Sequence, residues 1–127
     1  MLSLENSEFL QKIYQSNFNI FELERNFGYD SVLITVSNLI FQKVNLRHLF
    51  DKDKFNNFIQ EISNGYQKNN PYHNAIHAGD VVQTTYILTK FSKIFEHKIF
   101  NDLDKYSLFL SCAIHDYKHP GLNNNFL

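Results

Sequence analysis

The chain of 127 residues contains only two prolines and four glycines. Antiparallel sandwiches and barrels need many tight turns, and glycine and proline supply much of the backbone geometry of those turns. A chain this poor in both residues is better suited to helices joined by a few loops. Its hydrophobic content of 43% is sufficient for a folded core, and its length is typical of one domain. These features predict an all-α fold, a compact bundle of several helices.

Apolar side chains recur with the spacing of an α-helix in four parts of the chain. One part contains a run of strand-forming residues, 32–36, but the wider pattern keeps the helical period. We expect Asp30 to cap this helix, Asp53 to cap the next one, and Asn101 or Asp102 to cap the last. The expected helices cover residues 32–40, 55–66, a segment that begins near His73 or Asn74, and 103–114.

The composition excludes several classes of protein. The 12 Lys and Arg residues and 13 Asp and Glu residues give a formal net charge of −1, without the basic excess of a nucleic-acid binder. The single cysteine, Cys112, rules out an internal disulfide framework, so we expect a reducing, cytoplasmic location. Residues 1–10 lack the basic start of a secretory signal, and no apolar run is long enough for a transmembrane helix. Membrane attachment of a parent protein through other segments stays open.

Four of the six histidines lie in two short clusters, whereas His48 and His97 stand alone and are expected at the surface. In the first cluster, a helix turning about 100° per residue would align the side chains of four residues on one stripe: His73, His77, Asp80 and Thr84. Aliphatic residues flank this stripe, so we expect it to line a cavity rather than face solvent. The alternative is a helix whose two histidines simply form hydrogen bonds, which is the commoner outcome for an isolated pair with this spacing.

The second cluster, residues 115–119, contains His115, Asp116 and His119 and follows a segment that is apolar nearly all round, which predicts a buried helix. Burial of an imidazole and a carboxylate is costly unless a partner compensates for it. A divalent cation does so, because imidazole supplies nitrogen and a carboxylate can bridge two ions. The alternative is an Asp–His pair at a helix end, but two such clusters favour a metal site. We expect Cys112 to act as a small apolar residue rather than as a ligand.

Together, residues 72–81 and 115–127 resemble the signature of the class I cyclic nucleotide phosphodiesterases, members of the HD-type metal-dependent phosphohydrolases. A looser similarity extends upstream to about Phe18. The resemblance implies that residues 18–127 are the N-terminal portion of a larger all-helical catalytic domain, truncated at the C-terminus, and that residues 1–17 form a lead-in helix. The missing portion would supply a further metal-binding Asp, the Gln that reads the purine and the clamp that grips the base.

The resemblance also implies a role for each matching residue. His73 corresponds to the general acid that protonates the leaving 3′ oxygen. His77, His115 and Asp116 correspond to ligands of two divalent metal ions, zinc with magnesium or manganese, and Asp116 to the ligand that touches both. The positions that match residues beside the metal-bound water or the substrate phosphate are Tyr72, Asp80, His119 and Asn124.

The implied function is hydrolysis of a 3′,5′-cyclic nucleotide, cAMP or cGMP, to the 5′-nucleotide by a hydroxide that two metal ions activate. Because part of the site is missing, we expect the chain to be inactive alone. One alternative is another HD-type phosphohydrolase that acts on nucleotides or other phosphoesters. A second is a helical metal-binding or regulatory module without catalytic activity. These residues do not predict the nucleotide preference or the oligomeric state.

Overall fold

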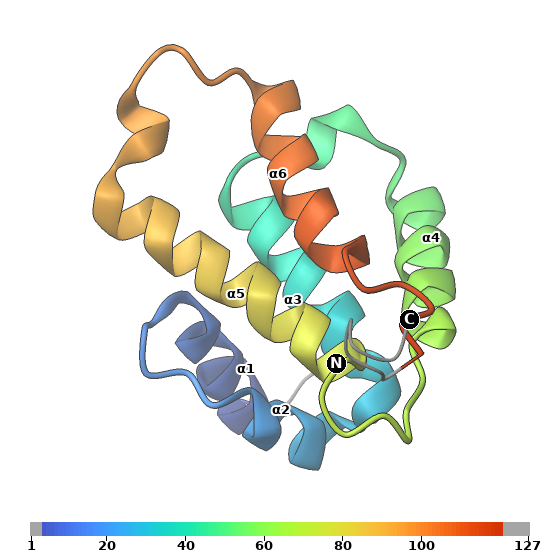
Figure 1. The fold of residues 1–127 in the computed structure, drawn as a ribbon. Coiled ribbons are helices and arrows are strands. Elements are labelled where there is room, and N and C mark those ends of the chain that lie inside the picture. Colours follow the sequence, from blue (N-terminus) through green and yellow to red (C-terminus); the bar gives the residue numbers. More distant parts are fainter. Residues whose placement is uncertain (1–3, 121–127) are drawn as a thin grey trace.

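The computed structural model describes residues 4–120 of the chain. Every regular element in this range is helical, which confirms the predicted all-α fold. None of these helices combines the length and the apolar character needed to cross a lipid bilayer. The elements are α1 (Leu4–Gln11), η1 (Lys12–Tyr14), α2 (Ile20–Phe27), α3 (Tyr29–Lys43), η2 (Arg47–Leu49), α4 (Lys52–Gly65), α5 (Ala75–Ser92), η3 (Ile94–Glu96) and α6 (Asp102–Ile114), where η denotes a short 3-10 helix (Figure 1).

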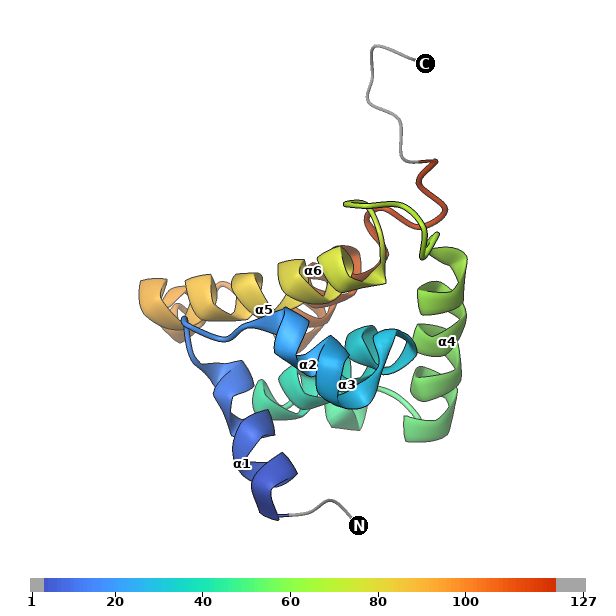
Figure 2. The same ribbon diagram turned by 90° about the horizontal axis from the view of Figure 1, so that it is seen from below.

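Helix α3 forms the centre of the bundle and contacts α2, α4, α5 and α6. Several of its apolar side chains are fully buried, including Val32, Val36 and Phe41. A helix that is apolar on most of its circumference is stable when neighbours cover it, and α1 and α4 lie on opposite sides of α3 in Figures 1 and 2. The run of strand-forming residues at 32–36 therefore forms a helix, because tertiary packing outweighs the local preference.

An aromatic cluster joins α3 to helices α4 and α6. The centroid of the Phe41 ring lies 4.9 Å from that of Phe55 on α4 and 6.2 Å from that of Phe109 on α6. The ring of Tyr106, also on α6, meets Phe41 edge to face at 5.6 Å. Aromatic pairs of this kind contribute about 0.5–1.5 kcal/mol each beyond the burial of their surface. They hold α6 against the core.

Two of the predicted helix caps are wrong by two residues. Gly28 is the N-cap of α3, and Asp30 lies in the first turn of that helix. Asp51 caps α4 by accepting hydrogen bonds from two backbone N–H groups at 3.0 Å, whereas the predicted cap, Asp53, lies in the first turn. A carboxylate is favourable in either position, because the first turn exposes N–H groups and the positive end of the helix dipole.

Helix α6 begins where the sequence predicts. Asn101 is its N-cap and forms a capping box with Asp104, in which each side chain accepts a hydrogen bond from the other residue's N–H group, at 2.8 and 3.0 Å. The prediction that α6 is buried nearly all round is wrong, since Leu108 is 38% exposed and Phe109 and Ala113 alone in this helix are buried. In the described part of the chain, α6 therefore covers the core with one face only.

Helix α5 begins after the first histidine of its cluster. Asn74 caps the helix by accepting a hydrogen bond from the N–H group of His77 at 3.1 Å, so the first helical residue is Ala75. The predicted stripe is therefore wrong at its first residue, because His73 lies in the preceding loop, whereas His77 and Asp80 both lie on α5 and line one surface cavity. An asparagine oxygen satisfies the free N–H groups of a helix start, and this interaction leaves His73 outside the helix.

Candidate metal centre

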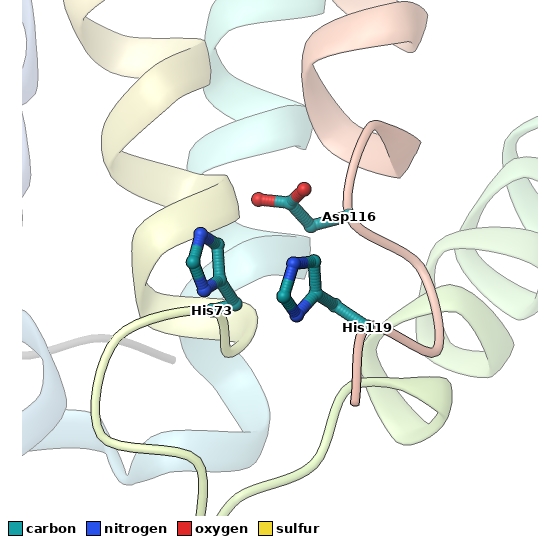
Figure 3. Close-up of side chains that lie close together, drawn as sticks. All are labelled: His73, Asp116 and His119. Atoms are coloured by element: carbon teal, nitrogen blue, oxygen red, sulfur yellow. The ribbon is translucent and has the colours of Figure 1, made fainter. Parts of the chain in front are cut away.

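The candidate site lies where two chain segments meet. One is the loop of residues 71–74 together with the first turn of α5, and the other is the turn of residues 115–119 after α6. Helices α5 and α6 pack against each other, which brings the segments together although 38 positions separate their closest histidines. In Figure 3 the side chains of His73, Asp116 and His119 point toward one another from these two segments.

Asn70 shapes the loop that carries His73. Its side-chain Oδ1 accepts hydrogen bonds from the N–H groups of Tyr72 (3.3 Å) and His73 (3.2 Å), and its carbonyl oxygen accepts one from Asn74 Nδ2 (2.9 Å). Asn70 is only 6% exposed, and its own Nδ2 has no hydrogen-bond partner within the described residues. Two oxygen atoms of one buried residue thus hold the loop and place His73 directly before α5.

The turn after α6 is held by the end of helix α4. The hydroxyl of Tyr66, the residue after α4, donates a hydrogen bond to the carbonyl oxygen of Ala113 (2.8 Å) and accepts one from the N–H group of Asp116 (3.3 Å). Burial raises the pKa of Tyr66 to about 12, so the hydroxyl keeps its proton at neutral pH. Further along, Lys118 has a left-handed φ of 59°, and the N–H group of His119 bonds to the Asp116 carbonyl oxygen at 2.9 Å. This reversal turns His119 back toward Asp116.

Three donor atoms converge at the first candidate metal position, formed by His77, His115 and Asp116. His115 Nε2 lies 2.9 Å from Asp116 Oδ2 and 3.3 Å from His77 Nε2. The distance between His77 Nε2 and the same carboxylate oxygen is 3.4 Å. Zinc bonds of about 2.0–2.2 Å place the ligands of a tetrahedral ion about 3.3–3.6 Å apart. The three atoms are therefore spaced much like three corners of a zinc coordination tetrahedron.

The tautomer of His115 shows why a cation suits this group. Its Nδ1 lies 2.7 Å from the carbonyl oxygen of Cys112, and because a carbonyl only accepts hydrogen bonds, Nδ1 carries the proton. In the neutral ring, Nε2 then presents a lone pair to the Asp116 carboxylate and to His77. Facing lone pairs repel unless a proton or a cation lies between them, so the donor set fits a divalent ion. The Cys112 sulfur belongs to neither donor group in the described chain.

His77 is held in the form that binds metal. Burial has the largest effect on its ring and lowers the pKa, and the neighbouring His115 ring lowers it further. The Asp116 carboxylate opposes this shift, but the net result is a pKa below the usual value for histidine. The neutral imidazole therefore dominates at neutral pH, and this is the form whose nitrogen lone pair coordinates a metal.

A second donor group shares Asp116 with the first. His73, Asp116 and His119 each offer one donor atom, and these atoms lie within 4.8 Å of one another. The rings of His73 and His119 are stacked, with centroids 3.9 Å apart and planes inclined by 16° (Figure 3). The carboxylate of Asp116 thus takes part in both groups, which places His73 and His119 directly beside the first candidate metal position.

The remaining predicted site residues lie around these groups. Tyr72 is 61% exposed, and the centroid of its ring lies 4.7 Å from that of His73 and 4.4 Å from that of His77. Asp80 belongs to neither donor group among the described residues, but it lines a surface cavity of about 780 Å³ together with Tyr72 and His77. Asn124 lies outside the described residues.

The two isolated histidines lie outside the candidate site. His48 and His97 are both exposed, as predicted, and His48 Nε2 lies 3.0 Å from Asp102 Oδ2. Neither belongs to a donor group in the described chain. The four clustered histidines therefore lie in the candidate site, and the two isolated ones lie at the surface outside it.

The site differs from the sequence-based picture in two respects. It is less buried than the apolar sequence of α6 predicts, because the His115 side chain lies just beyond the helix and is 34% exposed. Two residues outside the predicted set, Tyr66 and Asn70, hold the segments that carry the donors. Both left a signal in the sequence: a tyrosine at the end of a buried helical face needs a partner for its hydroxyl, and an asparagine before proline is typical of a turn.

Comparison with known proteins finds a similarity in the part of the chain that contains the site. Residues 72–127 match the model of the 3′5′-cyclic nucleotide phosphodiesterase family. This segment is similar to that family. The match includes every residue of both donor groups and confirms the resemblance seen in the sequence.

Curated relatives carry the same family name. The 3′,5′-cyclic-AMP phosphodiesterase 4 of Dictyostelium discoideum is 45% identical over 74 residues, which is 58% of this chain and 7% of that protein. The 3′,5′-cyclic-nucleotide phosphodiesterase regA of the same organism is 44% identical over 75 residues, or 58% of this chain and 9% of that protein. The 3′,5′-cyclic-AMP phosphodiesterase 4C of Rattus norvegicus is 33% identical over 112 residues, or 87% and 20%. The chain thus spans between 7% and 20% of the length of these relatives.

Proposed function

We propose that this chain takes part in the metal-dependent hydrolysis of a 3′,5′-cyclic nucleotide, cAMP or cGMP, to the 5′-nucleotide. The family match and the names of the relatives support this class of reaction. The observation that carries the proposal is the pair of donor groups that share Asp116 within the matched residues. In this proposal residues 18–127 are the N-terminal portion of a phosphodiesterase catalytic domain, and residues 1–17 lead into it. The single cysteine fits a reducing, cytoplasmic compartment.

His77, His115 and Asp116 are the proposed protein ligands of the metal. The mixed imidazole and carboxylate donors suit two divalent ions, zinc with magnesium or manganese. When bound, such ions neutralise the charge of a phosphate and lower the pKa of a bound water toward neutrality. The carbonyl of Cys112 orients the His115 ring so that its Nε2 presents a lone pair, and burial favours the neutral form of His77, the form that can bind a metal.

His73 is the proposed general acid. Attack of a water oxygen on phosphorus breaks the bond to the 3′ oxygen, and His73 supplies the proton that this oxygen takes up as it leaves. The ring of His73 lies outside the His77 group and stacks on His119, so it can adjoin the phosphate without serving as a ligand of the first ion. Proton donation of this kind contributes about 10²–10⁴ in rate. The residues proposed to surround the phosphate and the attacking water are Tyr72, Asp80, His119 and Asn124.

The 127-residue chain by itself is proposed to bind metal without hydrolysing cyclic nucleotides. The first donor group contains three protein atoms. In the proposal, other parts of the catalytic domain supply the remaining ligand and the contacts to the nucleotide base. An assay of the purified chain with zinc and manganese tests this. Metal is expected to bind. Measurable hydrolysis of cAMP or cGMP would contradict the proposal that hydrolysis requires other parts of the catalytic domain.

A chimeric enzyme tests the activity itself. Residues 72–127 of this chain would replace the matching segment of the Dictyostelium cyclic-AMP phosphodiesterase 4, and hydrolysis of cAMP would be measured in the purified chimera. The chimera is expected to hydrolyse cAMP. His73→Ala in the chimera should lower kcat by about 10²–10⁴.

The control for this experiment is His97→Ala, since His97 is an exposed histidine of the transferred segment that lies outside both donor groups. This variant should keep the activity of the chimera. A folded chimera that binds metal but cleaves no cyclic nucleotide would contradict the proposal. Cleavage of other phosphoesters by that chimera would favour another kind of phosphohydrolase, and the absence of any cleavage would favour a metal-binding module.

A further inference from the structure

Tyr66 connects helix α4 to the residue shared by both donor groups. Its side chain is almost completely buried, with 4% of the residue exposed. The hydroxyl donates to the carbonyl oxygen of Ala113 at 2.8 Å and accepts from the N–H group of Asp116 at 3.3 Å. A phenolic hydroxyl has one proton and two lone pairs, so it can make both bonds at once.

These two bonds cross the end of helix α6. The carbonyl of Ala113 is among the last carbonyls of the helix, which lack partners within it, and Asp116 lies in the turn beyond the helix end. The Tyr66 hydroxyl therefore joins the last turn of the helix to the residue that follows. It also ties both of them to α4, which packs against the central helix α3.

A second contact joins the end of α4 to the same turn. The ring of Tyr117 occupies the space that a side chain at Gly65, the last residue of α4, would need. A Cβ atom at Gly65 would overlap this ring, so the turn can lie where it does only because residue 65 is glycine. The two last positions of this segment, Gly65 and Tyr66, thus determine how closely the turn approaches α4.

The position of Asp116 matters because its partners belong to other elements. His77 lies in the first turn of α5, and His73 lies in the loop before that helix, whereas Asp116 belongs to the turn after α6. The distance of 3.4 Å between His77 Nε2 and Asp116 Oδ2 depends on where the turn is held. A movement of the turn changes the geometry of both donor groups, because they share Asp116.

We propose that Tyr66 is a positioning residue for metal binding: it holds the Asp116 backbone so that the carboxylate meets His77 and His115 at ligand spacing. This inference rests on the proposed metal-dependent function. In this inference Tyr66 contacts neither the metal nor the substrate and influences metal binding through the position of Asp116.

Tyr66→Phe in the 127-residue chain removes the hydroxyl and leaves the ring. Two properties would be measured at a temperature where the protein is fully folded: the affinity for zinc, by competition with a chelator, and the hydrogen exchange rate of the Asp116 amide, by NMR. Zinc affinity should fall by about 10–100-fold, the range for partners that orient metal ligands. Exchange at the Asp116 amide should become faster, because its hydrogen bond is lost.

Tyr86→Phe is the matched control. Tyr86 is a buried tyrosine of α5 whose ring packs against Tyr14, away from the turn. It should leave zinc affinity and Asp116 exchange unchanged, even if it lowers the melting temperature. A merely structural role of Tyr66 would make the two variants alike in both readouts, and that result would overturn the proposal.

A second variant approaches the turn from the glycine. Gly65→Ala favours the helix but displaces Tyr117, so zinc affinity should fall, and adding Tyr117→Ala should restore it. Unchanged affinity in Gly65→Ala would count against positioning by α4. If the unaltered chain binds no zinc, the proposed function fails, and Asp116 exchange in Tyr66→Phe still decides whether Tyr66 holds the turn.

Discussion

Replacement of Asn70 by alanine tests how the chain holds His73 in front of helix α5. The Asn70 side chain accepts hydrogen bonds from two backbone N–H groups, those of Tyr72 and His73, and is 6% exposed. Each such bond contributes about 0.5–1.5 kcal/mol net, so the loss of both removes about 1–3 kcal/mol. The same substitution deletes Nδ2, which lacks a partner in the described chain, and this returns about 1 kcal/mol of desolvation penalty.

The expected net loss for Asn70→Ala is therefore about 1 kcal/mol in the free energy of unfolding, within a range of about 0–2 kcal/mol, or about 4 °C in Tm for a chain of this length. Asn70→Asp is the informative comparison. It keeps an oxygen that can accept both bonds and removes the unpartnered amide donor. Charge-assisted bonds to two N–H groups offset the burial of the carboxylate, so this variant should be less destabilised than the alanine variant.

Urea unfolding of the 127-residue chain, followed by far-UV circular dichroism, measures the difference. The urea concentration at the unfolding midpoint should be highest for the unaltered chain, intermediate for Asn70→Asp and lowest for Asn70→Ala. An alanine variant as stable as the unaltered chain would show that the two bonds do not hold the loop. An aspartate variant as unstable as the alanine variant would show that the side-chain oxygen is not the atom that matters.

Further predictions concern the donor groups. His73→Ala should keep the metal content of the chain, whereas Asp116→Ala should abolish metal binding because it removes a donor atom from both groups. Elemental analysis after gel filtration measures the metal content of each variant. Loss of metal from the His73 variant would show that His73 is a ligand. The lowered pKa of His77 means that the unfolded chain binds a proton more readily than the folded chain does. In metal-free protein, stability from this residue should be complete above the usual histidine pKa of about 6.5 and be lost as pH falls through the folded pKa. His77→Gln should flatten that part of the curve, and equal curves for both proteins would refute the assignment.

The helical framework could be predicted because its signals are local and repeated. The period of apolar residues identifies α3 although residues 32–36 favour a strand, and Asn101 marks the start of α6 through its capping box. The predicted caps Asp30 and Asp53 are wrong because an acidic residue is favourable both at the N-cap and in the first turn of a helix, so its presence does not fix the first residue. The side of a helix that remains open depends on neighbours far away in sequence, which is why the exposure of Leu108 was not predictable.

The residues of the candidate site could be predicted from the sequence, but the distances between their side chains could not. The spacing of two clusters identified the histidines and Asp116, yet their distances follow from the packing of α5 against α6. His73 was placed on a helix because the cap formed by Asn74 could not be distinguished from a helical residue by periodicity. Tyr66 and Asn70 each act through two side-chain hydrogen bonds to the backbone; the sequence shows that each side chain needs partners but not which backbone groups provide them.

X-ray absorption at the zinc edge of the zinc-loaded chain tests the central claim most directly, since it reports the ligand atoms around the ion. The convergence of His77 Nε2, His115 Nε2 and Asp116 Oδ2 predicts nitrogen and oxygen neighbours only, with the outer-shell scattering of two imidazoles and bond lengths of about 2.0–2.2 Å. His115→Ala should remove one imidazole from that spectrum. A sulfur neighbour at about 2.3 Å, which in this part of the chain only Cys112 could provide, or a spectrum unchanged by His115→Ala, would contradict the account.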